Sequence, residues 1–115
     1  MLPKKNRLKE KNDFNAIYLK GKFFSLGELS IKFAKNKHLE SRIGFAIGKK
    51  YSKLAIERNR AKRVLRSAMF ALLDNIKPGF DIIIMMTKKQ SATPLKKDVV
   101  LQHLQKILAK NNLLK

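Results

Sequence analysis

The clearest pattern along the chain is a helical repeat of apolar residues over 57–75. Seven apolar side chains recur at helical spacing: Ala61, Val64, Leu65, Ala68, Met69, Leu72 and Leu73. At about 100° per residue, these positions fall on one face of an α-helix. Glu57 suits the positive end of the helix dipole, and Lys77-Pro78-Gly79 is typical of a helix end. The pattern therefore predicts an amphipathic helix over 57–75.

Shorter apolar patterns predict one more helix near each end of the chain. Asn12 or Asp13 can cap the first of these helices, and Gly21 can end it. Thr93 can cap the last helix, with Pro94 as its first residue. The first helix would carry Phe14, Ile17 and Tyr18 on one side, and the last helix would carry Val100, Leu101, Leu104, Ile107 and Leu108.

Four further segments have the patterns of β-strands. Residues 22–26 form a short candidate, and residues 29–33 alternate apolar and polar side chains, as a half-buried strand does. Residues 42–47 place Ile43, Phe45 and Ile47 on one face. Residues 80–87 contain a continuous apolar run, which is typical of a strand buried on both faces. Polar loops are expected at 35–40 and 48–55.

The order of these elements is helix, three strands, helix, strand, helix. It predicts an α+β fold, a two-layer α/β sandwich in which helices cover a small sheet. A length of 115 residues is that of one domain, so we expect a single domain over 1–115. There is no cysteine, which fits a reducing cytoplasm. No secretory signal and no membrane-spanning run is expected, because no apolar segment is long enough.

The charge of the chain narrows its function. Twenty-seven Lys and Arg against eight Asp and Glu give a net charge of +19. Self-repulsion of this size opposes folding, so a partner of opposite charge is expected. Nucleic acid is the favoured partner, because the release of its counterions drives binding. A membrane surface is the alternative, but it requires a basic helix with bulky apolar anchors, and we expect no membrane association.

The polar side of the 57–75 helix is strongly basic. Asn59, Arg60, Arg63 and Arg66 point away from the apolar face, with Arg58 and Lys62 on its flanks. No acid lies between the cations to neutralise them through i, i+4 pairs. A solvated surface is the alternative, yet soluble helices usually mix both signs of charge. Arginine suits phosphate oxygens, so this face predicts a nucleic-acid contact. Asn59 either forms a local cap or turn or reads a ribose or base edge.

Four blocks of sequence resemble one known family. The central block is Arg58-Asn59-Arg60-Ala61-Lys62-Arg63-Val64-Leu65-Arg66, preceded by Arg42-Ile43-Gly44-Phe45-Ala46-Ile47-Gly48-Lys49-Lys50. The opening block is Arg7-Leu8 with Asp13-Phe14, Tyr18 and Gly21, and the closing block is Asp81-Ile82-Ile83-Ile84 with Leu101-Gln102-His103-Leu104. In order and spacing they resemble the bacterial ribonuclease P protein component, whose signature is the RNR motif of the central block.

The resemblance implies a fold and a function. The fold would be a small mixed sheet with a left-handed crossover at the RNR helix, similar to a ribosomal-protein domain. The function would be that of the protein subunit of ribonuclease P, which removes the 5′ leader from precursor tRNA. The catalytic RNA and its Mg²⁺ ions would carry the hydrolysis, so we expect no catalytic side chain, no cofactor or metal bound by the protein alone, and no obligate protein partner.

The resemblance also assigns residues to two surfaces. The surface for the catalytic RNA would comprise Lys49, Lys50, Lys53, Arg58, Asn59, Arg60, Lys62, Arg63 and Arg66. The cleft for the single-stranded leader would comprise Phe14, Tyr18, Lys32 and Lys88. An aromatic side chain stacks on any unpaired base, as a subunit that serves every precursor requires. Core packing is the alternative role for Phe14 and Tyr18.

Three residues depart from the family pattern or remain outside it. Lys32 stands where relatives often carry an aromatic residue, and a phosphate contact would replace the lost stacking. Met86 stands near a usually basic position, for which Lys88 or Lys89 would substitute. Phe70 falls on the polar side of the RNR helix, where a contact with a neighbouring segment is the only role that we expect.

The sequence gives little support for a metal site or for a catalytic site made of protein side chains. His38 and His103 lack a third metal ligand or a nucleophile at useful spacing. The acids are scattered and form no paired-carboxylate pattern of a two-metal nuclease. Two alternatives therefore remain beside ribonuclease P: a structural RNA-binding protein similar to a ribosomal protein, and a nuclease that needs no RNA.

Overall fold

A computed structural model describes residues 2–86 and 96–115, and its main helices and strands follow the predicted order. A short 3₁₀ turn, η1 (Lys4–Asn6), precedes the first helix, and another, η2 (Leu73–Asn75), extends the second. The main elements are α1 (Lys11–Lys20), β1 (Lys22–Leu26), β2 (Leu29–Lys35), β3 (Arg42–Ile47), α2 (Ala55–Leu72), β4 (Phe80–Met86) and α3 (Lys97–Lys110). The predicted α+β class is confirmed.

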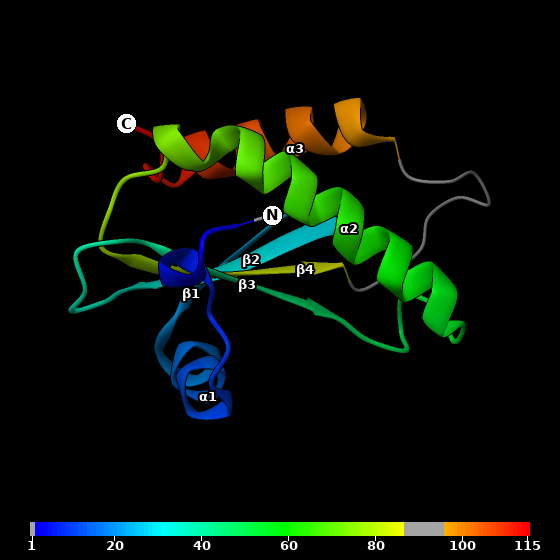
Figure 1. Ribbon diagram of the computed structural model, residues 1–115, viewed down its shortest axis with the longest axis horizontal. Helices are drawn as coiled ribbons and strands as arrows, with labels where there is room; N and C mark the ends of the chain where they lie inside the picture. Colours follow the sequence, from blue (N-terminus) through cyan, green and yellow to red (C-terminus); the bar gives the residue numbers. More distant parts are fainter. Residues whose placement is uncertain (1, 87–95) are drawn as a thin grey trace.

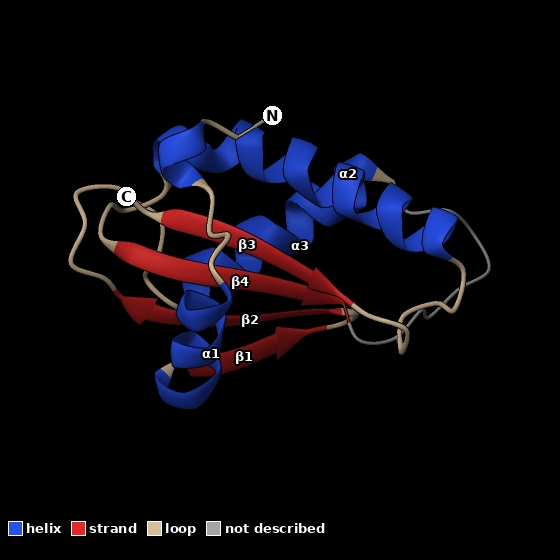
Figure 2. Cartoon of the chain, turned by 60° about the horizontal axis from the view of Figure 1, so that its bottom comes forward, coloured by secondary structure: helices blue, strands red, loops and turns tan. Residues whose placement is uncertain are grey.

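The strands form one mixed sheet in the order β1-β2-β4-β3. β2 pairs antiparallel with β1 and with β4, whereas β3 and β4 are parallel. Parallel neighbours need a crossover connection, and α2 supplies it. As Figure 2 shows, the chain passes from β3 through α2 to β4 in the left-handed sense, against the usual rule. The small mixed sheet and its crossover agree with the family resemblance.

The helices cover the two faces of the sheet unequally. α2 and α3 lie together on one face, and α1 lies on the other (Figure 1). The α2 face holds the large core, to which β3 contributes Ile43 and Ile47 as predicted. Among the described residues, the buried apolar cluster on the α1 face consists of Leu8, Ile17 and Ile83. The run in β4 is therefore apolar without alternation because both of its faces are covered.

The predicted caps of the first and last helices are wrong. α1 begins at Lys11 with Glu10 at its N-cap, because the Asp13 carboxylate binds Arg42 instead of capping the helix. The N-cap of α3 is Lys96, and the helix begins just before its apolar stripe. Thr93 and Pro94 lie outside the described residues.

Two other boundaries move by a few residues. α2 begins at Ala55, before the predicted start, because the Ser52 hydroxyl accepts a hydrogen bond from the Leu54 N–H and turns the chain early. β2 continues through Lys35, since its pairing with β4 extends to the register of Lys35 with Phe80.

Candidate nucleic-acid interface

The basic face of α2 has the orientation that the sequence predicts. Ala61, Leu65 and Met69 are buried in the large core. On the opposite side, Asn59, Arg60, Arg63 and Arg66 are exposed, and Arg58 and Lys62 are half-buried on the flanks. Within the described part of the chain, no carboxylate lies within ion-pair distance of these cations. The face is therefore free to bind phosphates.

The loop before α2 is braced by Arg58. Its Nη1 donates a hydrogen bond to the Ser52 carbonyl oxygen at 2.9 Å, and the Ser52 hydroxyl donates to Glu57 at 2.5 Å. The three lysines of the expected RNA-binding loop, Lys49, Lys50 and Lys53, are exposed. Arg58 therefore holds the loop that presents these lysines beside the basic face, in addition to the RNA contact that the resemblance implies.

Phe14 and Tyr18 of α1 lie side by side over the other face of the sheet. Their ring centroids are 6.3 Å apart. Phe14 is half-buried and packs against Leu8 and Ile17. Tyr18 is 38% exposed, and the partial burial of its hydroxyl raises the pKa of Tyr18. Phe14 is thus partly core, as the alternative role anticipated, whereas Tyr18 remains accessible.

Gly44 of β3 allows Phe14 to lie this close to the sheet. A Cβ atom at Gly44 would be 2.5 Å from the Phe14 Cζ atom, well inside van der Waals contact. The sequence showed only a glycine in a strand, a position that often marks close approach of another group. The position of the Phe14 ring therefore depends on the absence of a side chain at Gly44.

Lys32 lies on the α1 side of the sheet, as the strand alternation predicts. Its Nζ donates a hydrogen bond to the Tyr18 carbonyl oxygen and lies 5.9 Å from the centroid of the Tyr18 ring. Lys32 thus holds the end of α1. Met86 is buried in the core, and Lys88 and Lys89 lie outside the described residues. Phe70 is 50% exposed, and nothing in the structure explains it.

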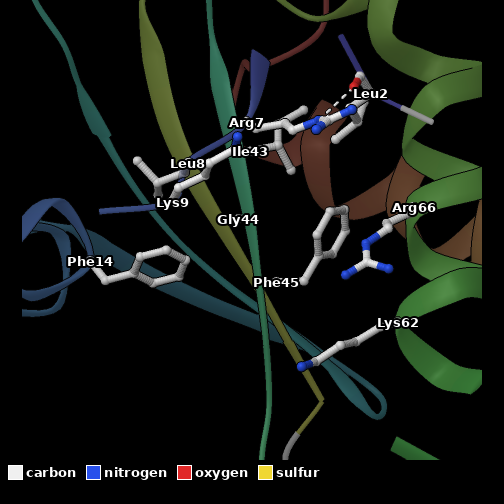
Figure 3. A pocket seen from close by; sticks show the side chains of 10 residues that line it. All are labelled: Leu2, Arg7, Leu8, Lys9, Phe14, Ile43, Gly44, Phe45, Lys62 and Arg66. Atoms are coloured by element: carbon white, nitrogen blue, oxygen red, sulfur yellow. Dashed lines mark hydrogen bonds between the residues drawn. The ribbon is translucent and has the colours of Figure 1, made fainter. Parts of the chain in front are cut away.

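Two hollows run along β3 and join the two predicted surfaces. Their volumes are about 410 and 510 Å³, and Phe45 and Lys62 line both. Figure 3 shows the first hollow, with Phe14 on one side of β3 and Phe45, Lys62 and Arg66 on the other. The lining residues include cations but neither Asp nor Glu: Arg7, Lys9, Lys49, Lys50, Lys62 and Arg66. We call the two hollows together the β3 groove.

Arg42 ties α1 to the sheet at one end of the β3 groove. Its Nε and Nη2 donate to the two carboxylate oxygens of the buried Asp81 at 2.9 and 2.7 Å, and its Nη1 donates to Asp13 of α1 at 3.2 Å. The hydrogen bond with Asp81 is the main cause that raises the pKa of Arg42. The bidentate pair fixes the guanidinium, which in turn holds the first turn of α1.

No group of three His, Asp or Glu side chains among residues 2–86 and 96–115 could hold a metal ion. No helix in this part of the chain has the length and apolarity needed to cross a bilayer.

Comparisons with known proteins identify the family. The sequence model of the family described as Ribonuclease P matches residues 2–112. The ribonuclease P protein component of Pseudanabaena sp. is 41% identical over 88 residues, which cover 76% of each chain. That of Picosynechococcus sp. is 37% identical over 107 residues, covering 93% of this chain and 90% of the relative.

Solved structures agree with the sequence comparisons. The RNase P protein of Staphylococcus aureus superimposes with a TM-score of 0.81 at 25% identity, covering 96% of this chain and 98% of that chain. The RNase P protein of Thermotoga maritima gives a TM-score of 0.80 at 29% identity, covering 90% and 96%. The chain therefore belongs to the ribonuclease P protein family, the protein components of a tRNA-processing ribonucleoprotein endoribonuclease that work with its RNA subunit.

Proposed function

We propose that the chain docks on the catalytic RNA of ribonuclease P through the basic face of α2 and its preceding loop. The same chain would bind the 5′ leader of precursor tRNA in the β3 groove beside Phe14 and Tyr18. It would act in the cytoplasm and assist endonucleolytic removal of the leader. The observation that carries this proposal is the β3 groove, which runs from the aromatic side chains of α1 to the unneutralised cations of α2.

The docking role follows from the charges. Exposed arginines bind phosphate oxygens through two parallel hydrogen bonds, and each neutralised phosphate releases counterions. Folded RNA hides its bases in a deep groove, so a protein recognises it by phosphates and shape. Arg60, Arg63 and Arg66 are exposed and have no carboxylate partner among the described residues, which suits them to this contact.

The leader-binding role follows from the accessible parts of the two rings. Stacking of an unpaired base on an aromatic side chain contributes roughly 1–3 kcal/mol and tolerates any base. Lys32 uses one of its three N–H donors on the Tyr18 carbonyl oxygen, and the other two would be available to a leader phosphate. Cations at the other wall of the groove, such as Lys62, would hold the leader backbone.

The hydrolysis itself would be carried by the RNA and its Mg²⁺ ions. A protein-borne two-metal site needs converging carboxylates. The carboxylates of Asp13 and Asp81 instead bind Arg42, and the β3 groove is lined by none. We therefore assign to the protein the binding of the catalytic RNA and of the substrate, and to the RNA the cleavage.

Reconstitution with a bacterial catalytic RNA at low Mg²⁺ concentration tests the proposal. The protein is expected to restore cleavage of a precursor tRNA at its mature 5′ end, because it replaces screening that the missing Mg²⁺ no longer supplies. A protein that binds the RNA without restoring cleavage would be a structural RNA-binding protein. Cleavage by the purified protein without any RNA would place the chemistry in the protein and contradict the division of labour.

A further inference from the structure

One part of the β3 groove lies on the α2 side of the sheet, away from Phe14 and Tyr18. We call it the edge pocket, and define it by its lining residues there: Leu2, Arg7, Ile43, Phe45, Lys62 and Arg66. We propose that the edge pocket binds one unstacked nucleotide of RNA, with its base on Phe45 and its phosphate on Lys62 and Arg66. The proposal deepens the proposed function and rests on it.

Phe45 is the aromatic surface of the edge pocket. It shares its face of β3 with Ile43 and Ile47, which are only 2% and 6% exposed. Phe45 lies between them on the strand but is only half-buried. The packing of α2 against this face of β3 is therefore incomplete at Phe45. In Figure 3 its ring projects from β3 into the space beside Lys62 and Arg66. A ring held by the core on one side is a rigid stacking surface on the other.

The position of β3 in the sheet makes the pocket accessible. β3 is an end strand, and among the described residues its outer edge is bridged only at Ile43 by Arg7. The Leu8 N–H donates to the Ile43 carbonyl oxygen at 3.0 Å. Beyond this bridge, the N-terminal segment turns toward α1 (Figure 3), and no other described strand pairs with the edge of β3 beside Phe45.

Three cations surround the ring. Lys62 and Arg66 are one helical turn apart on α2, so their side chains lie on the same side of the helix. Arg7 is held by its Nε, which donates to the Leu2 carbonyl oxygen at 2.8 Å, and its terminal nitrogens remain at the rim. None of the residues that line the pocket is acidic. Repulsion among the three cations is relieved when an anion binds between them.

An aromatic ring beside three cations favours a nucleotide over simpler ligands. Inorganic phosphate would use the cations but not the aromatic ring, and an apolar ligand would leave the cations without partners. The edge pocket is part of a hollow of about 410 Å³, a volume in the range of small-molecule sites. A base on Phe45 with its phosphate on the helix satisfies both parts of the pocket, as aromatic and basic side chains do in proteins that bind single strands.

Titration of the full chain followed by amide NMR tests the pocket with adenosine 5′-monophosphate and inorganic phosphate as probes. Both probes should shift the signals around Arg66, and only the nucleotide should strongly shift those of Ile43 and Phe45. Phe45→Leu should weaken nucleotide binding by about 5-fold or more and leave phosphate binding unchanged. Arg66→Gln should weaken both, and Phe45→Tyr, which keeps the ring, should retain the nucleotide.

The matched control is Phe24→Leu, since Phe24 is also half-buried against the large core but lies on β1 at the other side of the sheet. It should change neither affinity. Equal nucleotide affinity in wild type and Phe45→Leu overturns the proposal. If Phe45→Leu fails to fold, nucleotide and phosphate that give the same shifts in the wild-type protein overturn it instead.

The reconstituted holoenzyme identifies the source of the nucleotide. If the nucleotide belongs to the leader, Phe45→Leu should lower the affinity for precursor tRNA relative to mature tRNA. If it belongs to the catalytic RNA, the same change should lower the affinity for that RNA. If Phe45→Leu changed neither the preference for precursor tRNA nor the affinity for the catalytic RNA, and leader cleavage were intact, the nucleotide site would be wrong. The proposed function would still stand.

Discussion

The two faces of the sheet differ in how much they bury. On the α2 and α3 face, a large core includes fully buried side chains such as Leu65, Met69 and Ile84. On the α1 face, the buried cluster comprises only Leu8, Ile17 and Ile83, with Phe14 half-buried beside it. The free energy of folding therefore comes mainly from one face, because it grows with the apolar area removed from water.

Under the proposed function, this difference would separate stability from leader binding. The α1 face, which supplies little of the core, leaves Phe14 and Tyr18 partly accessible. α1 is held to that face by a few specific contacts, namely the Arg42–Asp13 pair, the Phe14–Gly44 approach and the Lys32–Tyr18 hydrogen bond. The two faces should therefore respond differently to mutation.

The largest effect is expected in the large core. Leu65→Ala removes a fully buried side chain and should lower the free energy of unfolding by about 2–5 kcal/mol. Ile17→Ala should cost less, because its smaller cluster lies near the open groove and relaxes more easily. Urea unfolding followed by circular dichroism measures both losses. An Ile17→Ala loss equal to or larger than that of Leu65→Ala would show that the two faces contribute alike.

The Arg42 network should show the next effect. Asp81→Asn weakens a bidentate pair with a buried carboxylate and should lower the free energy of unfolding by about 1–3 kcal/mol. Asp13→Asn breaks the more exposed pair and should cost less than about 1 kcal/mol. Asp13→Asn should nevertheless loosen α1, which faster hydrogen exchange confined to α1 would reveal. If the hydrogen-exchange rates of α1 in Asp13→Asn equalled those of wild type, the Arg42–Asp13 pair would not hold the helix.

Gly44→Ala should lower both stability and leader affinity. The new methyl group displaces the Phe14 ring, so affinity for precursor over mature tRNA should fall by about 1–3 kcal/mol. Gly48→Ala is the control, because a Cβ atom there meets nothing within 4 Å. Adding Phe14→Leu to Gly44→Ala should recover stability without recovering leader affinity. Unchanged leader affinity in Gly44→Ala would remove Phe14 from the leader site.

The smallest effect concerns Tyr18. Burial raises its pKa in the folded state, so its hydroxyl stabilises the fold below the pKa of the unfolded chain, near pH 10. That contribution is lost as the pH rises through the higher folded-state pKa. Unfolding free energies of wild type and Tyr18→Phe, measured across this range, should diverge slightly in alkali. Identical pH profiles would mean that the Tyr18 hydroxyl is fully solvated.

Periodicity predicted most of the fold because burial controls it. The apolar stripe of α2 required that one side of the helix pack against the sheet. The uninterrupted apolar run in β4 required that both faces of the strand be covered. The cap predictions failed at Asp13 because its carboxylate has a tertiary partner, Arg42, which no local pattern reveals. The sense of the crossover came from the family resemblance alone.

The sequence predicted which of the candidate residues are exposed, but not the shape of the surface that they form. Helical spacing identified the exposed arginines of α2, and the resemblance identified Phe14 and Tyr18. That Lys62 of α2 and the rings of α1 line one groove depends on the edge position of β3, which follows from the order of the strands. Phe45 looked like an ordinary strand residue, and the glycine at position 44 indicated close approach of another group without showing that this group is Phe14.

In the proposed function, one surface docks the catalytic RNA while another binds the leader. The most direct test compares Arg60→Gln/Arg63→Gln with Phe14→Ala in binding assays over a range of salt concentrations. The double variant should weaken catalytic RNA binding and lower its salt slope by roughly one unit per lost contact, with the preference for precursor over mature tRNA unchanged. Phe14→Ala should reduce that preference and leave the slope unchanged. If both variants changed the same quantity, the separation of the two surfaces would be wrong.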